Sequence, residues 1–157
     1  MSVLSLVAER GVALMTEQPR NPDGLVLMVE DDRNQILFLK RAFGKLRIPN
    51  PLHVVSDGQQ AVLFLSDKSH PPPALVLLDL MVPRVRGLKV LEWMRLQPEL
   101  RETPVVIVTT SIEPADRRRA DDLGVLAYLC KPVFAEGLRE LMDMVPWLVP
   151  AGREPSR

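Results

Sequence analysis

Side chains able to do chemistry follow four apolar runs of this sequence, each at the point where the run ends. Carboxylates that share one crevice repel each other, and a hard divalent cation such as Mg²⁺ relieves that repulsion through oxygen ligands. An ammonium group and a hydroxyl beside them would serve an anion, so the set fits phosphoryl chemistry. Its members are Glu30, Asp31, Asp32, Asp79, Thr109, Thr110, Ser111 and Lys131.

These side chains meet only if the apolar runs are strands of one parallel sheet. The sequence predicts strands at 25–29, 52–55, 75–78, 105–108 and 125–129, and helical spacing of apolar residues follows each of them. Strands that are apolar throughout are typical of sheets covered on both faces. We therefore expect a doubly wound α/β fold with five parallel strands and five helices, whose ligands bind at the carboxyl ends of the strands.

Composition narrows the class of protein. The 157 residues suffice for one domain with its own core, and the 20 basic and 20 acidic residues cancel, so the charge favours neither nucleic acid nor a membrane surface. The single cysteine, Cys130, fits a reducing cytoplasm and is expected to be a small buried residue. No apolar run approaches the roughly 20 residues that span a bilayer.

The predicted organisation is an extension or linker over 1–23, one domain over 24–146 and a tail over 147–157. Val3, Leu4, Leu6 and Val7 could form a short amphipathic helix, followed by a proline-rich linker. Met15 is an alternative start of translation, so the sequence leaves open whether residues 1–14 are part of the protein.

The motifs in this order resemble the receiver domain of two-component response regulators. The resemblance covers about residues 25–145 and implies the flavodoxin-like strand order of that family. The motifs are Val29-Glu30-Asp31-Asp32, Leu78-Asp79 with Pro83 and Gly87 downstream, Val108-Thr109-Thr110-Ser111, and Lys131-Pro132.

The resemblance implies a role for each matching residue. Asp79 would accept a phosphoryl group from a histidine kinase, and Thr109 and Lys131 would contact that group. Mg²⁺ would be held by Asp31 and Asp79, by Glu30 through water, and by the main-chain carbonyl of Met81. Tyr128 would be the aromatic switch residue whose rotamer follows Thr109, and the Lys131-Pro132 bond would be cis. Such a protein is a switch and not an enzyme beyond Mg²⁺-dependent self-phosphorylation and slow self-dephosphorylation.

Two short segments, the loop 48–52 and the turn 108–111, are similar to those of regulators paired with bacterial phytochromes. This similarity implies a bacteriophytochrome as the partner kinase. It also implies a homodimer through the fourth helix, fifth strand and fifth helix, with Trp147, Leu148 and Val149 extending the apolar patch.

Three positions depart from the common family pattern: Met81, Ser111 and Arg86. Apolar Met81 could shield an acyl phosphate from water, which predicts slow self-dephosphorylation, whereas Arg86 suggests no role. The rival enzyme reading, an aspartate-nucleophile phosphohydrolase, needs a second aspartate at position 81. A nucleotide-binding module is disfavoured because its glycine-rich motifs are missing.

Plainer readings of the same residues remain open. Residues 30–32 could be an acidic turn that begins a helix. Tyr128 could be ordinary core packing, and 109–111 could cap the fourth helix.

Overall fold

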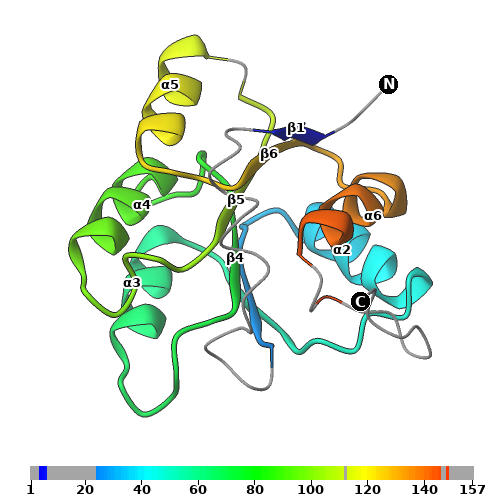
Figure 1. The fold of residues 1–157 in the computed structure, drawn as a ribbon, viewed down its shortest axis with the longest axis horizontal. Helices are drawn as coiled ribbons and strands as arrows, with labels where there is room; N and C mark the ends of the chain where they lie inside the picture. The colour runs from blue at the N-terminus through cyan, green and yellow to red at the C-terminus, as the bar shows by residue number, and fades with distance from the viewer. Residues whose placement is uncertain (1–3, 7–23, 112, 146–147, 149–157) are drawn as a thin grey trace.

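The computed structural model describes residues 4–6, 24–111, 113–145 and 148, and it contains one six-stranded sheet with helices on both faces (Figure 1). The strand order is β1-β6-β5-β4-β2-β3, in which the last five strands are parallel. The predicted five-stranded parallel sheet is confirmed, with one additional strand at its edge. No helix in the described part of the chain is long and apolar enough to cross a membrane.

Strands and helices alternate from β2 onward, as the apolar periodicity predicts. The strands are β2 (Val26–Val29), β3 (Leu52–Val55), β4 (Leu75–Leu78), β5 (Val105–Thr109) and β6 (Ala127–Cys130). The helices are α2 (Arg33–Lys45), α3 (Gly58–Ser66), α4 (Gly87–Leu96), α5 (Pro114–Asp122) and α6 (Ala135–Met144).

Local sequence signals explain where several helices begin and end. The carboxylate of Asp32 accepts a 2.8 Å hydrogen bond from the amide of Asn34 and begins α2. Asp57 does the same for α3 through the amide of Gln60, at 2.7 Å. Gly124 follows α5 with a φ of +72°, a left-handed conformation that glycine adopts without steric cost.

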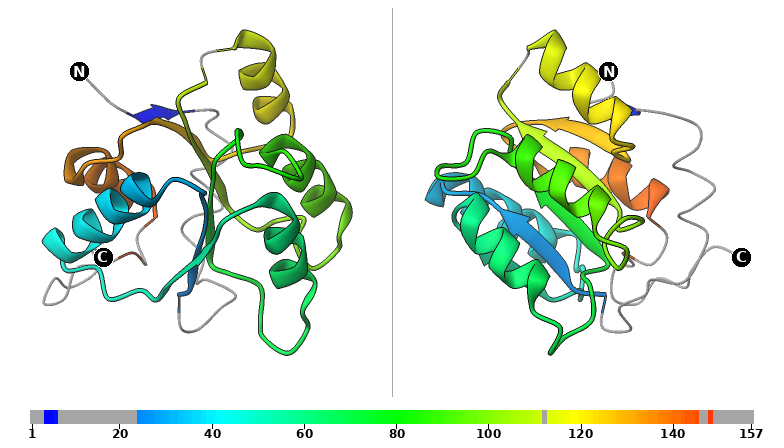
Figure 2. Two further views of the ribbon diagram at one scale, coloured as in Figure 1. Left: turned by 180° about the vertical axis from the view of Figure 1, so that it is seen from behind. Right: turned by 90° about the vertical axis from the view of Figure 1, so that its left-hand side faces the viewer.

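The sheet separates two apolar cores. Helices α2 and α6 cover one face, whereas α3, α4 and α5 cover the other (Figure 2). The central strands β2, β4 and β5 are buried along their whole length, because each contributes side chains to both cores. The chemistry at their carboxyl ends is therefore carried on rigid supports.

The N-terminal extension differs from the prediction. Leu4–Leu6 form strand β1, which pairs antiparallel with β6, in place of the amphipathic helix expected over this stretch. A helix of so few residues has an unfavourable nucleation step, whereas the open edge of β6 offers backbone partners at once. The other domain boundaries, and the alternative start at Met15, remain predictions.

Three further expectations of burial were wrong. Strand β3 is the far edge of the sheet, so His53 is exposed and the strand is not covered on both faces. Cys130 is exposed, because it is the last residue of β6, where the strand leaves the core. Leu148 is 1% exposed and packs in the core beside α6, so it cannot extend an apolar surface patch. Trp147 and Val149 lie outside the described residues.

Candidate functional site

The carboxyl ends of the four central strands bring the predicted residues to one edge of the sheet. Hydrogen bonds fix the strand ends to one another: the amide of Asp79 donates to the carbonyl of Val29 at 3.1 Å, and the amide of Lys131 donates to Thr109 at 3.1 Å. Residues from four separate stretches of sequence thus reach one site.

The centre of the site is an ammonium group held between two buried carboxylates. The Nζ atom of Lys131 lies 2.6 Å from an oxygen of Asp79 and 2.5 Å from an oxygen of Glu30. The lysine side chain is 7% exposed, and the two acids are exposed by 3% and 1%. Charged groups this deeply buried are costly unless they are paired, so the three side chains depend on one another.

This burial and pairing shift the acidity of the groups. Burial raises the pKa of Glu30, and its hydrogen bonds from Lys131 and from the amide of Asp32 offset only part of that rise. For Lys131, burial alone would lower the pKa, but the hydrogen bonds to Asp79 and Glu30 outweigh it and the pKa is raised. Lys131 is therefore a fixed positive charge at neutral pH.

Three carboxylates form a group that fits a divalent cation. Oxygens of Glu30, Asp31 and Asp79 lie within 4.8 Å of one another, and Asp31 is exposed to solvent. Three negative charges against one ammonium leave an excess of two, and all the donors are hard oxygens, which suits Mg²⁺. Asp32 points elsewhere and caps α2, so the acidic triplet contains both a helix cap and a candidate metal site.

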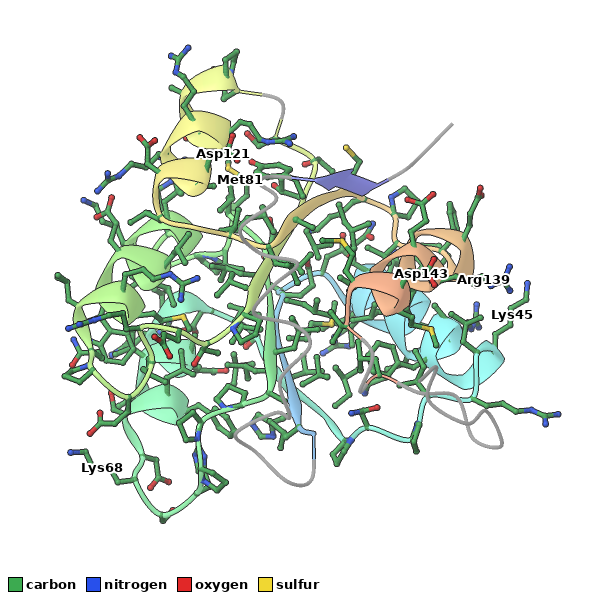
Figure 3. The ribbon with its side chains drawn as sticks, viewed as in Figure 1. Lys45, Lys68, Met81, Asp121, Arg139 and Asp143 are labelled. Carbon is green, nitrogen blue, oxygen red and sulfur yellow. The ribbon has the colours of Figure 1, made fainter. Side chains whose placement is uncertain are left out.

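The loop after β4 passes directly over Asp79. One oxygen of Asp79 accepts a 3.0 Å hydrogen bond from the amide of Met81. Met81, which is labelled in Figure 3, is 56% exposed. A Cβ at Gly87 would lie 2.3 Å from the carbonyl oxygen of Asp79, so only glycine allows α4 to begin this close to the strand end. Arg86 carries no capping hydrogen bond, and its guanidinium contacts the Met81 sulfur at 3.8 Å.

The hydroxyl residues lie one strand further along. Thr109 is fully buried, and its hydroxyl oxygen accepts a 3.1 Å hydrogen bond from the amide of Ser111. The Ser111 hydroxyl in turn donates to Asp116 of α5 at 3.2 Å. Residues 109–111 do not cap this helix, because the N-cap position of α5 is Glu113 and no side chain makes a capping hydrogen bond there. The contact between Ser111 and Asp116 instead joins the end of β5 to the first turn of α5.

Tyr128 is 5% exposed, on the side of the sheet that faces α5. The guanidinium carbon of Arg117 lies 4.6 Å from the centre of its ring, a contact that the sequence analysis missed. The i,i+4 spacing of Arg117 and Asp121 was visible in the sequence, and the pair forms at 3.5 Å. Nothing in that spacing indicated the tyrosine. The Lys131-Pro132 peptide bond is cis, as the resemblance implied.

Comparisons with known proteins agree with this geometry. The family model described as "Response regulator receiver domain" matches residues 26–143. The chain is 33% identical over 150 residues to the probable methanogenesis regulatory protein FilR2 of Methanothrix harundinacea, covering 92% of this chain and 94% of the relative. It is also 33% identical to response regulator Rcp1 of Synechocystis, covering 80% of this chain and 86% of Rcp1.

Solved structures extend the comparison. The bacteriophytochrome response regulator RtBRR superposes with a TM-score of 0.73 at 33% identity, covering 85% of this chain and 84% of that one. The Mn²⁺-bound form of Rcp1 superposes with a TM-score of 0.67 at 29% identity, covering 85% and 99%. The chain belongs to the receiver-domain family of response regulators and is related to the regulators of phytochromes.

Proposed function

We propose that this protein is a phosphorylation switch in which Asp79 accepts a phosphoryl group from a sensor histidine kinase. The observation that carries the proposal is the contact of the Lys131 ammonium with the Asp79 carboxylate, 2.6 Å apart in a buried acidic site. The phosphoryl group arrives with negative charge, and Lys131 is already placed to pair with it.

The transfer is a displacement at phosphorus. A carboxylate oxygen of Asp79 forms a P–O bond while the P–N bond of the donor's phosphohistidine breaks, and the electron pair of that bond goes to the imidazole nitrogen. Lys131 neutralises the transferred oxygens, and the Thr109 hydroxyl donates to one of them once its side chain turns toward the group. Burial of these groups strengthens each electrostatic contact.

Mg²⁺ would be held by Glu30, Asp31 and Asp79, together with the carbonyl of Met81. When bound, it supplies positive charge on the phosphoryl oxygens and offsets the repulsion between the carboxylates. The protein's own contribution is to keep two of these acids in place: Lys131 pairs with both Glu30 and Asp79, and the amide of Asp32 donates a 3.0 Å hydrogen bond to Glu30.

The phosphoryl group would stay on Asp79 as a stored signal. The phosphohydrolase alternative requires an acid two residues after the nucleophile, and the site has the exposed thioether of Met81 there. A thioether cannot deliver a proton to a leaving group or activate water. Slow self-dephosphorylation follows from the same feature.

The readout would be the surface built from α5, β6 and α6. Phosphorylation would add nearly two negative charges close to Thr109, and a change in the rotamer of Tyr128 would carry the effect to the surface around β6. We propose that this surface contacts a second copy of the chain or the partner protein, and that the kinase is a bacteriophytochrome, as the relationship to RtBRR and Rcp1 suggests.

Incubation with Mg²⁺ and acetyl phosphate, followed by intact-mass measurement, tests the central step. The wild type is expected to gain the mass of one phosphoryl group, and Asp79→Asn is expected to gain none. An unmodified wild type would refute the proposal. Light scattering of the same samples tests the dimer, which predicts a rise in mean mass on phosphorylation that depends on protein concentration.

A further inference from the structure

The loop that joins β4 to α4 contains a residue in an unfavourable backbone conformation. Arg84 has a φ of +69°, in the left-handed region that residues with a Cβ adopt at a cost. The amide of Val85 donates to the carbonyl of Pro83 at 2.9 Å, so Arg84 is the central residue of a tight turn. Arg47, the other non-glycine residue with a positive φ in the described part of the chain, follows the end of α2, where this conformation is common. No helix end explains the conformation of Arg84.

The side chain of Arg84 forms an ion pair with a buried carboxylate. Its Nε atom lies 3.4 Å from Oδ2 of Asp57, and the two side chains are exposed by 68% and 8%. The other oxygen of Asp57 accepts the hydrogen bond from the amide of Gln60 that caps α3. A buried carboxylate is costly without a partner of opposite charge. Arg84 therefore supplies the cation for Asp57 and is itself fixed against the start of α3.

Main-chain contacts bring the turn and the start of α3 together at the same place. The amide of Gly58 donates to the carbonyl of Pro83 at 3.3 Å. A Cβ at Gly58 would overlap the carbonyl group of Val85, so only glycine allows the turn to approach this closely. The outer part of the loop is thus held by α3 and not by the phosphorylation site.

The inner part of the same loop lies over the site. Met81, three residues before Arg84, donates its amide to Asp79 at 3.0 Å, and its carbonyl is a proposed Mg²⁺ ligand. The loop closes where the amide of Gly87 donates to the carbonyl of Leu80 at 3.2 Å. The main chain of Met81 therefore lies between Asp79 and the turn at Arg84, and movement of the turn would move the Met81 carbonyl.

We infer that Arg84 is a positioning residue of the proposed metal site, because its ion pair with Asp57 fixes the Met81 carbonyl beside Asp79 before a cation binds. The inference deepens the proposed function and rests on it for the identity of the ligand, Mg²⁺. A ligand atom that is fixed in advance loses less conformational freedom on binding, so the affinity is higher than for a mobile loop. Glycine would fit the turn without strain, but it would leave Asp57 without its cation.

The charge of Arg84 makes the test sharp, because it acts in the opposite direction to positioning. A guanidinium near a cation site repels the cation, so removal of the charge alone would strengthen Mg²⁺ binding. Loss of positioning would weaken it. Arg86 provides the matched control, since it is an exposed arginine of the same loop whose guanidinium contacts the Met81 sulfur.

The variants separate the ion pair from the backbone. Arg84→Gln removes the charge and keeps a Cβ, Arg84→Gly also relieves the left-handed strain, and Asp57→Asn removes the negative charge and keeps a residue that caps helices. Arg86→Gln is the charge control. Urea unfolding first establishes that each variant is folded.

Titration calorimetry with MgCl₂, without any phosphodonor, measures the Kd for Mg²⁺. An ion pair of ordinary strength corresponds to about a fivefold change in affinity. We expect binding about fivefold weaker in Arg84→Gln and Arg84→Gly, and unchanged or tighter in Arg86→Gln. Adding Arg84→Gln to Asp57→Asn should weaken binding no further, because the two residues act as one pair.

The second measurement follows the loop itself without metal. A ¹⁵N-methionine label restricts the spectrum to the seven methionines of the chain, and Met81→Leu identifies the resonance of Met81. We expect solvent exchange of the Met81 amide to be about fivefold faster in Arg84→Gly, with no change at the core residues Met28 and Met94. Equal acceleration at all three amides would overturn the inference, because it would report a general loss of stability.

The two proposals fail in different ways. If the wild type binds Mg²⁺ and Arg84→Gln binds it as tightly as Arg86→Gln, Arg84 does not position the site and the proposed function stands. If the wild type does not bind Mg²⁺, the metal site of the proposed function is refuted and the role of Arg84 falls with it.

Discussion

Replacing Arg95, which lies in helix α4, is expected to cost this domain a large part of its stability. Its guanidinium donates to the carbonyl oxygens of Leu123 at 2.8 Å, Thr103 at 2.9 Å and Arg101 at 3.0 Å. Two longer contacts, of 3.4 Å each, reach Leu100 and Gly124. One side chain thereby joins the loop before β5 to the turn before β6.

The magnitude follows from these bonds. Arg95 is half-buried, and this burial lowers the pKa of its guanidinium, so the charged group relies on the carbonyl oxygens for hydrogen bonds. Three short bonds from a charged donor, each contributing about 1 kcal/mol net, give a loss of about 3 kcal/mol for Arg95→Met. For a chain of this size that loss corresponds to a fall in Tm of about 6 to 12 °C.

Arg95→Lys keeps the positive charge but removes the planar guanidinium group with its several donors. An ammonium group has its three donors on one atom and cannot serve both loops as the planar guanidinium does. We expect it to recover less than half of the loss. Urea denaturation followed by far-ultraviolet circular dichroism measures the free energies of unfolding, with Arg118→Met as the exposed control. If the free energies of unfolding of Arg95→Met and the control differ by less than about 0.5 kcal/mol, the hydrogen bonds from Arg95 to the carbonyl oxygens do not stabilise the fold.

Three other predictions concern the site and its surroundings. Gly87→Ala should fail to give a stable fold, seen as a lost unfolding transition, because its Cβ would overlap the main chain of Asp79, 2.3 Å away; a normal transition would contradict this. Lys131→Gln should lower the free energy of unfolding by about 3 kcal/mol, because Glu30 and Asp79 would remain buried without their cation. Millimolar Mg²⁺ should restore part of this loss in the same urea assay. A loss that Mg²⁺ does not change would count against the metal site. The pKa of Tyr128 is raised from 10.0 to about 12 in the folded protein, so its contribution to stability is complete below pH 10 and is lost as the pH rises toward 12. Between pH 9 and pH 11 the free energy of unfolding should therefore fall by about 1.4 kcal/mol more in the wild type than in Tyr128→Phe. Parallel pH profiles of the two proteins would refute this prediction.

The fold and the centre of the site follow from features that are local in sequence. An apolar run of strand length followed by a polar residue is a local pattern, and parallel connections bring the ends of such runs to one edge. Glu30, Asp79 and Lys131 could therefore be placed together before the structure was known. Met81 could be placed next to Asp79 for the same reason.

Features that depend on contacts between distant elements could not be predicted in this way. Arg95 and Arg117 occur in helices with ordinary charged patterns, and nothing near them in sequence indicates the carbonyls or the ring that they contact. The short strand β1 was misread because three residues carry too little periodicity to distinguish a strand from a helix. The burial of Leu148 was wrongly predicted because it depends on packing against the core beside α6, which is not a local property of the sequence.

Strand β1 is a short cover on one edge of the sheet. It covers β6 through three residue pairs, Leu4 with Leu129, Ser5 with Tyr128 and Leu6 with Ala127. A peptide strand that forms more residue pairs along β6 would gain main-chain hydrogen bonds when it displaces β1, as in β-strand addition to an open sheet edge. Because the middle pair contains Tyr128, such an exchange would take place on the backbone of the proposed switch residue.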